Sequence, residues 1–146
     1  MAKNFFTESQ QASIVQAIKQ AELNTSGEVQ VHLENKCKKD VMTRAREVFI
    51  SLDMSKTALK NGVLFYLAVE DQKFAILGDK GIDNVVPSTF WDDIKNAMQA
   101  RFKAGQFCEG LCEGILAAGQ QLKTHFPYQN NDTNELSDEI SFGNQS

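Results

Sequence analysis

Residues 61–83, NGVLFYLAVEDQKFAILGDKGID, hold two apolar segments separated by a short polar one. The first segment, residues 62–69, is almost continuously apolar, which is typical of a central strand covered on both faces. Residues 70–72 favour a turn, and residues 73–77 favour a second strand. Because the connection is so short, we expect the two strands to form an antiparallel hairpin.

A further strand and two helices are predicted upstream of this hairpin. Residues 28–34 alternate between apolar and polar side chains, which predicts a half-buried strand. Thr7 and Gln10 fit a capping box, so we expect the first helix to begin at Thr7. Asp40 is a suitable N-cap for a second helix.

Two more helices are predicted downstream, one opened by Pro87 and Ser88 and one over about residues 106–124. This order of elements predicts an α/β fold: a small mixed β-sheet, including an antiparallel hairpin, sandwiched between helices on both faces. We expect one domain over residues 1–128. An acidic tail over residues 129–146 would pack back in part near the functional site.

Length and charge narrow the class of protein. The chain has 146 residues, a length that favours one domain. Its net charge of −4 argues against a nucleic-acid partner. The four acidic residues of the tail carry the whole imbalance. The longest apolar run has seven residues, too short for a membrane span, and three cysteines suggest no disulfide framework. We therefore expect a cytoplasmic protein with free thiols.

The common catalytic motifs GxxxxGK[ST], HExxH and GxSxG are absent. Cys108 and Cys112 share a helical stripe with apolar residues, so we interpret them as core residues rather than metal ligands. Cys37 lies among lysines, and we expect it in a surface loop. We expect structural roles for His32 and His125, because neither has a catalytic partner nearby in the sequence.

Two segments are harder to explain by packing alone. Residues 78–83, GDKGID, place carboxylates between two glycines where a strand ends, and glycines let backbone approach a ligand closely. Residues 130–139, NNDTNELSDE, place oxygen-bearing side chains at alternate positions, loosely as in calcium loops. The alternatives are an ordinary loop and a solvated acidic tail.

The same segments and the strands between them carry a family resemblance that covers about residues 5–140. The matching motifs are Ser26-Gly27-Glu28-Val29-Gln30-Val31, Asn61-Gly62-Val63-Leu64-Phe65-Tyr66-Leu67-Ala68, Phe74-Ala75-Ile76-Leu77-Gly78-Asp79-Lys80-Gly81-Ile82-Asp83, Trp91, Gly105-Gln106-Phe107 with Gly110-Leu111, and Asn134-Glu135-Leu136-Ser137-Asp138-Glu139-Ile140. In these motifs the sequence resembles the TPM domain family. That family includes a thylakoid-lumen acid phosphatase, proteins of photosystem II repair and a modulator of acetylcholine receptors.

The resemblance implies an α/β sandwich that binds a divalent metal, usually Ca²⁺ or Mg²⁺. Many bacterial relatives carry a signal peptide, a membrane helix and a Gly-rich tail. This sequence has no such segments, so we expect a small stand-alone bacterial member.

Our first hypothesis is a domain that binds Ca²⁺ or Mg²⁺ and acts as a binding or regulatory module. One alternative is a metal-dependent acid phosphatase acting on phosphomonoesters, with Lys80 as the obvious phosphate partner. Another is a metal-independent protein-interaction domain, whose partner would be a protein. The predicted metal ligands are Asp79, Asp83, Asp132, Asn134 and Asp138, with Glu28 as an additional candidate.

Overall fold

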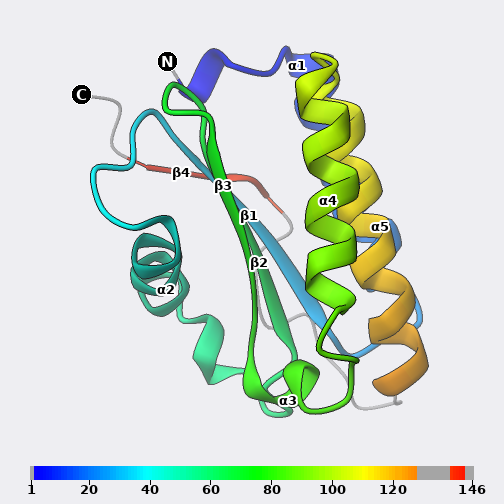
Figure 1. The fold of residues 1–146 in the computed structure, drawn as a ribbon. Helices are drawn as coiled ribbons and strands as arrows, with labels where there is room; N and C mark the ends of the chain where they lie inside the picture. Colours follow the sequence, from blue (N-terminus) through cyan, green and yellow to red (C-terminus); the bar gives the residue numbers. More distant parts are fainter. Residues whose placement is uncertain (1, 128–138, 144–146) are drawn as a thin grey trace.

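Four strands form one mixed sheet in the computed structural model, which describes residues 2–127 and 139–143 (Figure 1). The order across the sheet is β3-β2-β1-β4. β2 pairs in parallel with β1 and antiparallel with β3, and β4 adds in parallel to the other side of β1. The strands are β1 (Glu28–Glu34), β2 (Gly62–Ala68), β3 (Lys73–Gly78) and β4 (Ser141–Phe142). The mixed sheet and its antiparallel β2–β3 hairpin are therefore as predicted.

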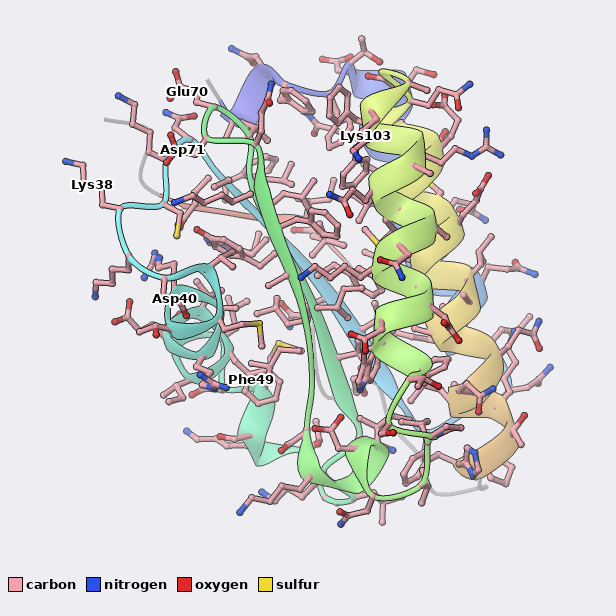
Figure 2. The ribbon with its side chains drawn as sticks, viewed as in Figure 1. Lys38, Asp40, Phe49, Glu70, Asp71 and Lys103 are labelled. Carbon is pink, nitrogen blue, oxygen red and sulfur yellow. The ribbon has the colours of Figure 1, made fainter. Side chains whose placement is uncertain are left out.

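One helix covers one face of the sheet. α2 (Val41–Ser51), followed by the short 3₁₀ helix η2 (Met54–Lys56), connects the parallel strands β1 and β2. A parallel pair needs such a crossover, because a tight turn cannot reverse the chain twice. Asp40 begins α2 and accepts a hydrogen bond from the Thr43 amide at 3.1 Å, as predicted. Phe49 lies on the side of α2 that faces the sheet (Figure 2).

Three longer helices cover the opposite face (Figure 1). The capping box of Thr7 and Gln10 is present at the start of the first, with hydrogen bonds of 3.0 and 3.1 Å. A single helical turn, α3, follows β3 and was not predicted, because four residues carry too little periodicity. The helices are α1 (Glu8–Glu22), α4 (Phe90–Lys103) and α5 (Phe107–His125); the shorter ones are η1 (Ala2–Asn4) and α3 (Lys80–Asp83).

Small residues let α5 pack closely against its neighbours. A Cβ on Gly114 would lie 2.6 Å from the Met98 sulfur on α4, and a Cβ on Gly119 would lie 2.7 Å from the Ala21 Cα on α1. Cys108 is buried in the same apolar core. Its pKa is raised by burial, as expected for a thiol that serves packing.

Two sequence-based expectations were wrong in detail. All seven residues of β1 are buried, not half of them, because α2 covers the polar face of the strand. Cys37 is also buried, since its loop folds under α2 and its thiol donates to the Lys39 carbonyl at 3.2 Å. Part of the expected tail, Ser141–Phe142, pairs with β1 as a strand. Within the described ranges, no helix has the length and apolar character required to cross a bilayer.

Candidate functional site

One end of the sheet brings two acidic residues into a single lateral row. Glu28, the first residue of β1, pairs with Gly62, the first residue of β2. Asp79 follows β3, and its amide donates to the Gly62 carbonyl at 2.9 Å. Laterally aligned residues of a sheet point to the same face. Leu64, two residues beyond Gly62, packs on the α2 side, so both carboxylates extend from that face. The buried Met54 side chain lies over Gly62, with its Cε 3.5 Å from the position that a Cβ on Gly62 would occupy.

Asp79 has one oxygen engaged and one available. Its Oδ1 accepts a hydrogen bond from the Lys80 amide at 2.8 Å and thereby caps α3. Its Oδ2 is buried and has no hydrogen-bond partner among the described residues. Burial of an unpartnered carboxylate oxygen is unfavourable, so such atoms are rare in folded proteins. This oxygen is therefore suited to accept from, or coordinate, a ligand.

Other oxygens surround this end of the sheet. Glu28 and Thr57 are each only 2% exposed, and the Thr57 hydroxyl is buried without a hydrogen-bond partner in the described part of the chain. The Met54 carbonyl lies 3.4 Å from the position that a Cβ on Gly62 would occupy. A Cβ on Gly81 would lie 2.2 Å from the Leu59 carbonyl, so glycine is required where α3 meets this loop.

The Asp83 side chain does not join the oxygens around Asp79. Its side chain is exposed, and its Oδ1 accepts a hydrogen bond from the Trp91 indole nitrogen at 2.8 Å. Within residues 2–127 and 139–143, no group of three or more His, Cys, Asp and Glu side chains is arranged to hold a metal ion. The predicted ligands Asp132, Asn134 and Asp138 lie outside the described residues.

A pocket of about 340 Å³ opens beside Asp83, between α2 and α4 and against the edge strand β3. Two cationic side chains line it, Arg46 from α2 and Lys95 from α4, together with the Ser88 hydroxyl and the carboxylate of Asp92. The sequence suggested only Lys80 as a phosphate partner. Arg46 and Lys95 were missed because they lie on separate helices that only the fold brings together.

A second polar cluster lies on the face of the sheet that α2 covers, at the end of β1 opposite Glu28. Glu34 forms a bidentate ion pair with Arg44, with distances of 2.8 Å from Nε to Oε2 and 2.9 Å from Nη2 to Oε1. The Tyr66 hydroxyl also donates to Glu34 Oε2, and His32 Nε2 lies 3.1 Å from Glu34 Oε1. His32 Nδ1 lies 3.0 Å from the Ser141 hydroxyl of β4.

The Glu34 carboxylate is fully paired within this cluster. Burial alone would raise the pKa of Glu34, but hydrogen bonds from Arg44, Tyr66 and His32 outweigh it and lower that pKa to about 2. Burial lowers the pKa of His32 and raises the pKa of Tyr66. Each Glu34 oxygen already has two neighbouring donor groups, so this carboxylate has no capacity left for a ligand. The alternation in β1 placed His32 and Glu34 on one face, but no sequence pattern indicated Arg44.

The fold is that of a mixed α/β sandwich, and residues 2–121 match the model of the TPM domain. The chain belongs to the TPM domain family. No curated protein matches it significantly. Among solved structures, the BA42 protein from the psychrophilic bacterium Bizionia argentinensis is similar, with 49% identity and a TM-score of 0.89 over 98% of this chain and 99% of that one.

Two more distant structures share the fold alone. The N-terminal domain of the cg2496 protein from Corynebacterium glutamicum is 13% identical, with a TM-score of 0.65 over 86% of this chain and 79% of that one. The N-terminal domain of a protein from P. gingivalis is 19% identical, with a TM-score of 0.69 over 87% and 84%. The resemblance to TPM domains and the predicted fold class are therefore confirmed.

Proposed function

We propose that the protein is a binding or regulatory module that takes up a divalent cation, Ca²⁺ or Mg²⁺, at the Glu28–Gly62–Asp79 end of the sheet. The observation that carries the proposal is the buried, unpartnered Oδ2 of Asp79. A cation there would replace the hydrogen bond that the oxygen lacks, and Glu28 lies in the same lateral row.

The surrounding donors suit a hard cation. Ca²⁺ accepts six to eight oxygen ligands, including carbonyl and hydroxyl oxygens as well as carboxylates, whereas Mg²⁺ demands a smaller octahedral set. Asp79 and Glu28 would supply charge, and the Thr57 hydroxyl and Met54 carbonyl are neutral oxygens of the same end. The acidic tail is the proposed source of further ligands, from Asp132, Asn134 and Asp138.

The experiment is a titration of metal-free protein with Ca²⁺ and then Mg²⁺, followed through amide shifts in two-dimensional NMR. We expect saturable shifts confined to Glu28, residues 54–62 and residues 79–83, together with the tail. Asp79→Asn keeps the cap on the Lys80 amide but removes the charge. It should weaken binding at least about tenfold, since even residues that only support metal ligands contribute that much.

The matched control is Asp93→Asn, which removes an exposed acid on α4 and should leave the titration unchanged. Absence of shifts at millimolar Ca²⁺ and Mg²⁺ would contradict the metal proposal. That outcome would favour the metal-independent protein-interaction domain.

A second candidate function is a metal-dependent phosphomonoesterase, and the pocket beside Asp83 favours it. Arg46 and Lys95 approach the pocket from two helices, so a phosphate there would meet two positive charges and the Ser88 hydroxyl. A divalent cation, when bound, would supply additional Lewis-acid charge for the phosphoryl oxygens. Asp83 would serve as a base or ligand, with the Trp91 indole fixing its orientation.

The test is hydrolysis of p-nitrophenyl phosphate in the presence of Mg²⁺ by purified protein. We expect Arg46→Gln and Lys95→Gln to raise KM and Asp79→Asn to abolish turnover. Lys123→Gln, a charge removed from the last turn of α5, is the control. If turnover is equal in all of these variants, the activity belongs to a contaminant.

A further inference from the structure

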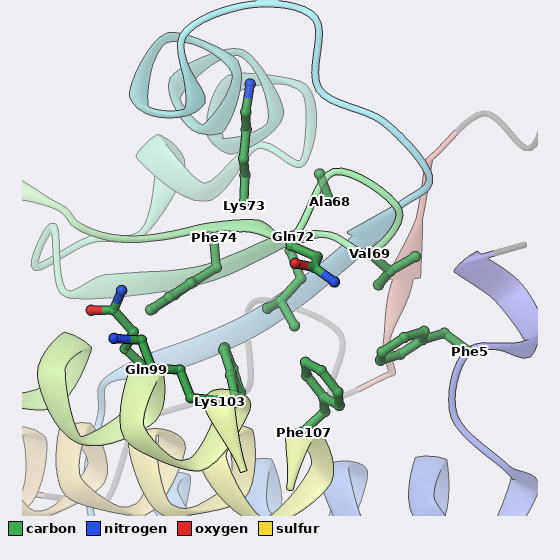
Figure 3. Close-up of a pocket in the computed structure, with 11 residues that line it drawn as sticks. Phe5, Ala68, Val69, Gln72, Lys73, Phe74, Gln99, Lys103 and Phe107 are labelled. Atoms are coloured by element: carbon green, nitrogen blue, oxygen red, sulfur yellow. The ribbon is translucent and has the colours of Figure 1, made fainter. Parts of the chain in front are cut away.

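A second pocket, of about 370 Å³, opens at the other end of the hairpin from Asp79 (Figure 3). Its walls come from the C-terminal end of β2, the β2–β3 turn, the start of β3, the last turns of α4, and Phe107 at the start of α5. Phe5, before α1, closes one side. Pockets of this volume are in the range that binds small molecules.

The floor of this pocket is aromatic. Phe107 lies 5.3 Å from Phe5 and 5.4 Å from Phe102, measured between ring centroids, and Phe102 lies 5.0 Å from Phe74. These four rings pack against one another, yet none is fully buried, and Phe5 is 36% exposed. Figure 3 shows the rings of Phe5 and Phe107 pointing into the open space. Apolar surface of this kind favours an apolar ligand, because burial removes it from water.

The charged residues that line the pocket are all positive. Its charged lining residues are two lysines, and no carboxylate lines it. Lys73 points away (Figure 3) and donates to the Cys37 carbonyl at 3.2 Å, so its ammonium serves the other face of the sheet. Lys103 is exposed on α4, beside the pocket, and makes no ion pair within the described residues. The amides of Gln72 and Gln99 add neutral polar groups at the rim.

We propose that this pocket binds amphipathic carboxylates, such as medium-chain fatty acids, with the alkyl chain against the four phenylalanines and the carboxylate at Lys103. The apolar floor selects a chain, and the single cationic rim residue selects a negative head group over a positive one. The pocket lies at the opposite end of β3 from Asp79, so this site is independent of the proposed cation site.

The test uses decanoate as the probe, below its micellar concentration, added to the full chain and followed by NMR. We expect saturable amide shifts at Phe5, Val69 and Phe107, and intermolecular NOEs between decanoate methylene protons and the phenylalanine rings. Each buried methylene should tighten binding about fourfold, so decanoate, with two more methylenes, should bind roughly fifteenfold tighter than octanoate. Shifts without NOEs to the rings would overturn the proposal.

Charge variants test the position of the head group. Lys103→Glu should weaken decanoate several-fold and strengthen decyltrimethylammonium, and it should not affect folding because Lys103 is exposed. Lys19→Glu changes net charge equally on the exposed side of α1 and should leave both affinities unchanged. If decyltrimethylammonium binds the native protein as tightly as decanoate, the pocket has no preference for anions and the proposal fails.

Discussion

The two faces of the sheet are held by different kinds of interaction. The face covered by α1, α4 and α5 is an apolar core in which residues such as Ile115, Leu111 and Met98 have 0 to 1% of their surface exposed. The face covered by α2 also buries charged groups, with Glu34, Arg44, Tyr66 and His32 joined in one cluster. Both faces exclude water, but only the second requires exact pairing of donors and acceptors.

This difference explains where ligand capacity lies. On the α2 face, the even-numbered side chains of β1 run from Glu34, whose acceptors are all occupied, to Glu28, which shares a lateral row with Gly62 and Asp79. One buried carboxylate has all its acceptors occupied, whereas Asp79 keeps a buried oxygen without a partner. The proposed cation site is therefore at the end where the polar face is unsatisfied.

Removal of the Glu34 carboxylate should have the largest effect on stability. Glu34→Ala leaves Arg44, Tyr66 and His32 without their shared acceptor, and loss of one partner of a buried pair costs about 3–5 kcal/mol. Urea unfolding at pH 7 measures this loss. Glu47→Ala removes a more exposed partner of Arg44 and should have a much smaller effect. Equal losses for the two variants would contradict the claim that the buried pairing of Glu34 is what stabilises the α2 face.

A cavity on the apolar face should cost slightly less. Ile115→Ala removes a fully buried side chain, and such truncations cost about 2–5 kcal/mol. Its loss should be the same at pH 7 and pH 4, because no titrating group is involved. The loss for Glu34→Ala should be smaller at pH 4. At that pH the Glu34 carboxyl is largely protonated in the unfolded chain but still ionised in the folded one. A pH-dependent loss for Ile115→Ala would contradict this.

An added methyl group between helices should have an intermediate effect. Gly119→Ala places a Cβ 2.7 Å from the Ala21 Cα, and overpacking of this kind costs about 1–3 kcal/mol. Thermal unfolding of this variant should show a lower Tm than that of Gln120→Ala, an exposed neighbour on α5. A Gly119→Ala protein as stable as the native one would mean that α5 can move away from α1 without loss.

The smallest predicted effect is the pH dependence due to His32. Burial lowers the pKa of His32 below 6.5, so the unfolded chain binds its proton more readily and stability falls as pH drops below about 6.5. A further fall follows between pH 4.5 and about 2, where Glu34 is protonated in the unfolded chain before the folded one. His32→Gln should reduce the fall in stability below about pH 6.5, measured by urea unfolding from pH 8 to 5.

The control for this pH dependence is His125→Gln, which changes an exposed histidine at the end of α5. It should leave the curve unchanged. A native curve that rises as pH falls from 7 to 5 would contradict the assigned role of His32.

Local rules in the sequence predicted the elements well. The capping box at Thr7, the cap at Asp40 and the antiparallel hairpin are all present, because each depends on residues close together in the chain. The start of α4 was placed slightly early, since Pro87 and Ser88 precede a turn before Phe90. The burial of Cys37 and of the polar side of β1 could not be predicted, because both depend on where α2 packs.

The candidate site was predicted in part by the same logic. The sequence singled out Asp79, Asp83 and Glu28, but their spacing could not reveal that Asp79 and Glu28 share a row while Asp83 bonds to Trp91. Lateral register between strands depends on long-range pairing, which has no local signal.

The sequence by itself determined the secondary structure, the class of fold and the family, because these follow from hydrophobic periodicity, caps and short motifs. Only the tertiary structure decided which polar groups are satisfied: four donor groups converge on Glu34, and none reaches Asp79 Oδ2 within the described residues. The physical reason is that hydrogen bonding and desolvation depend on distances between elements far apart in the chain.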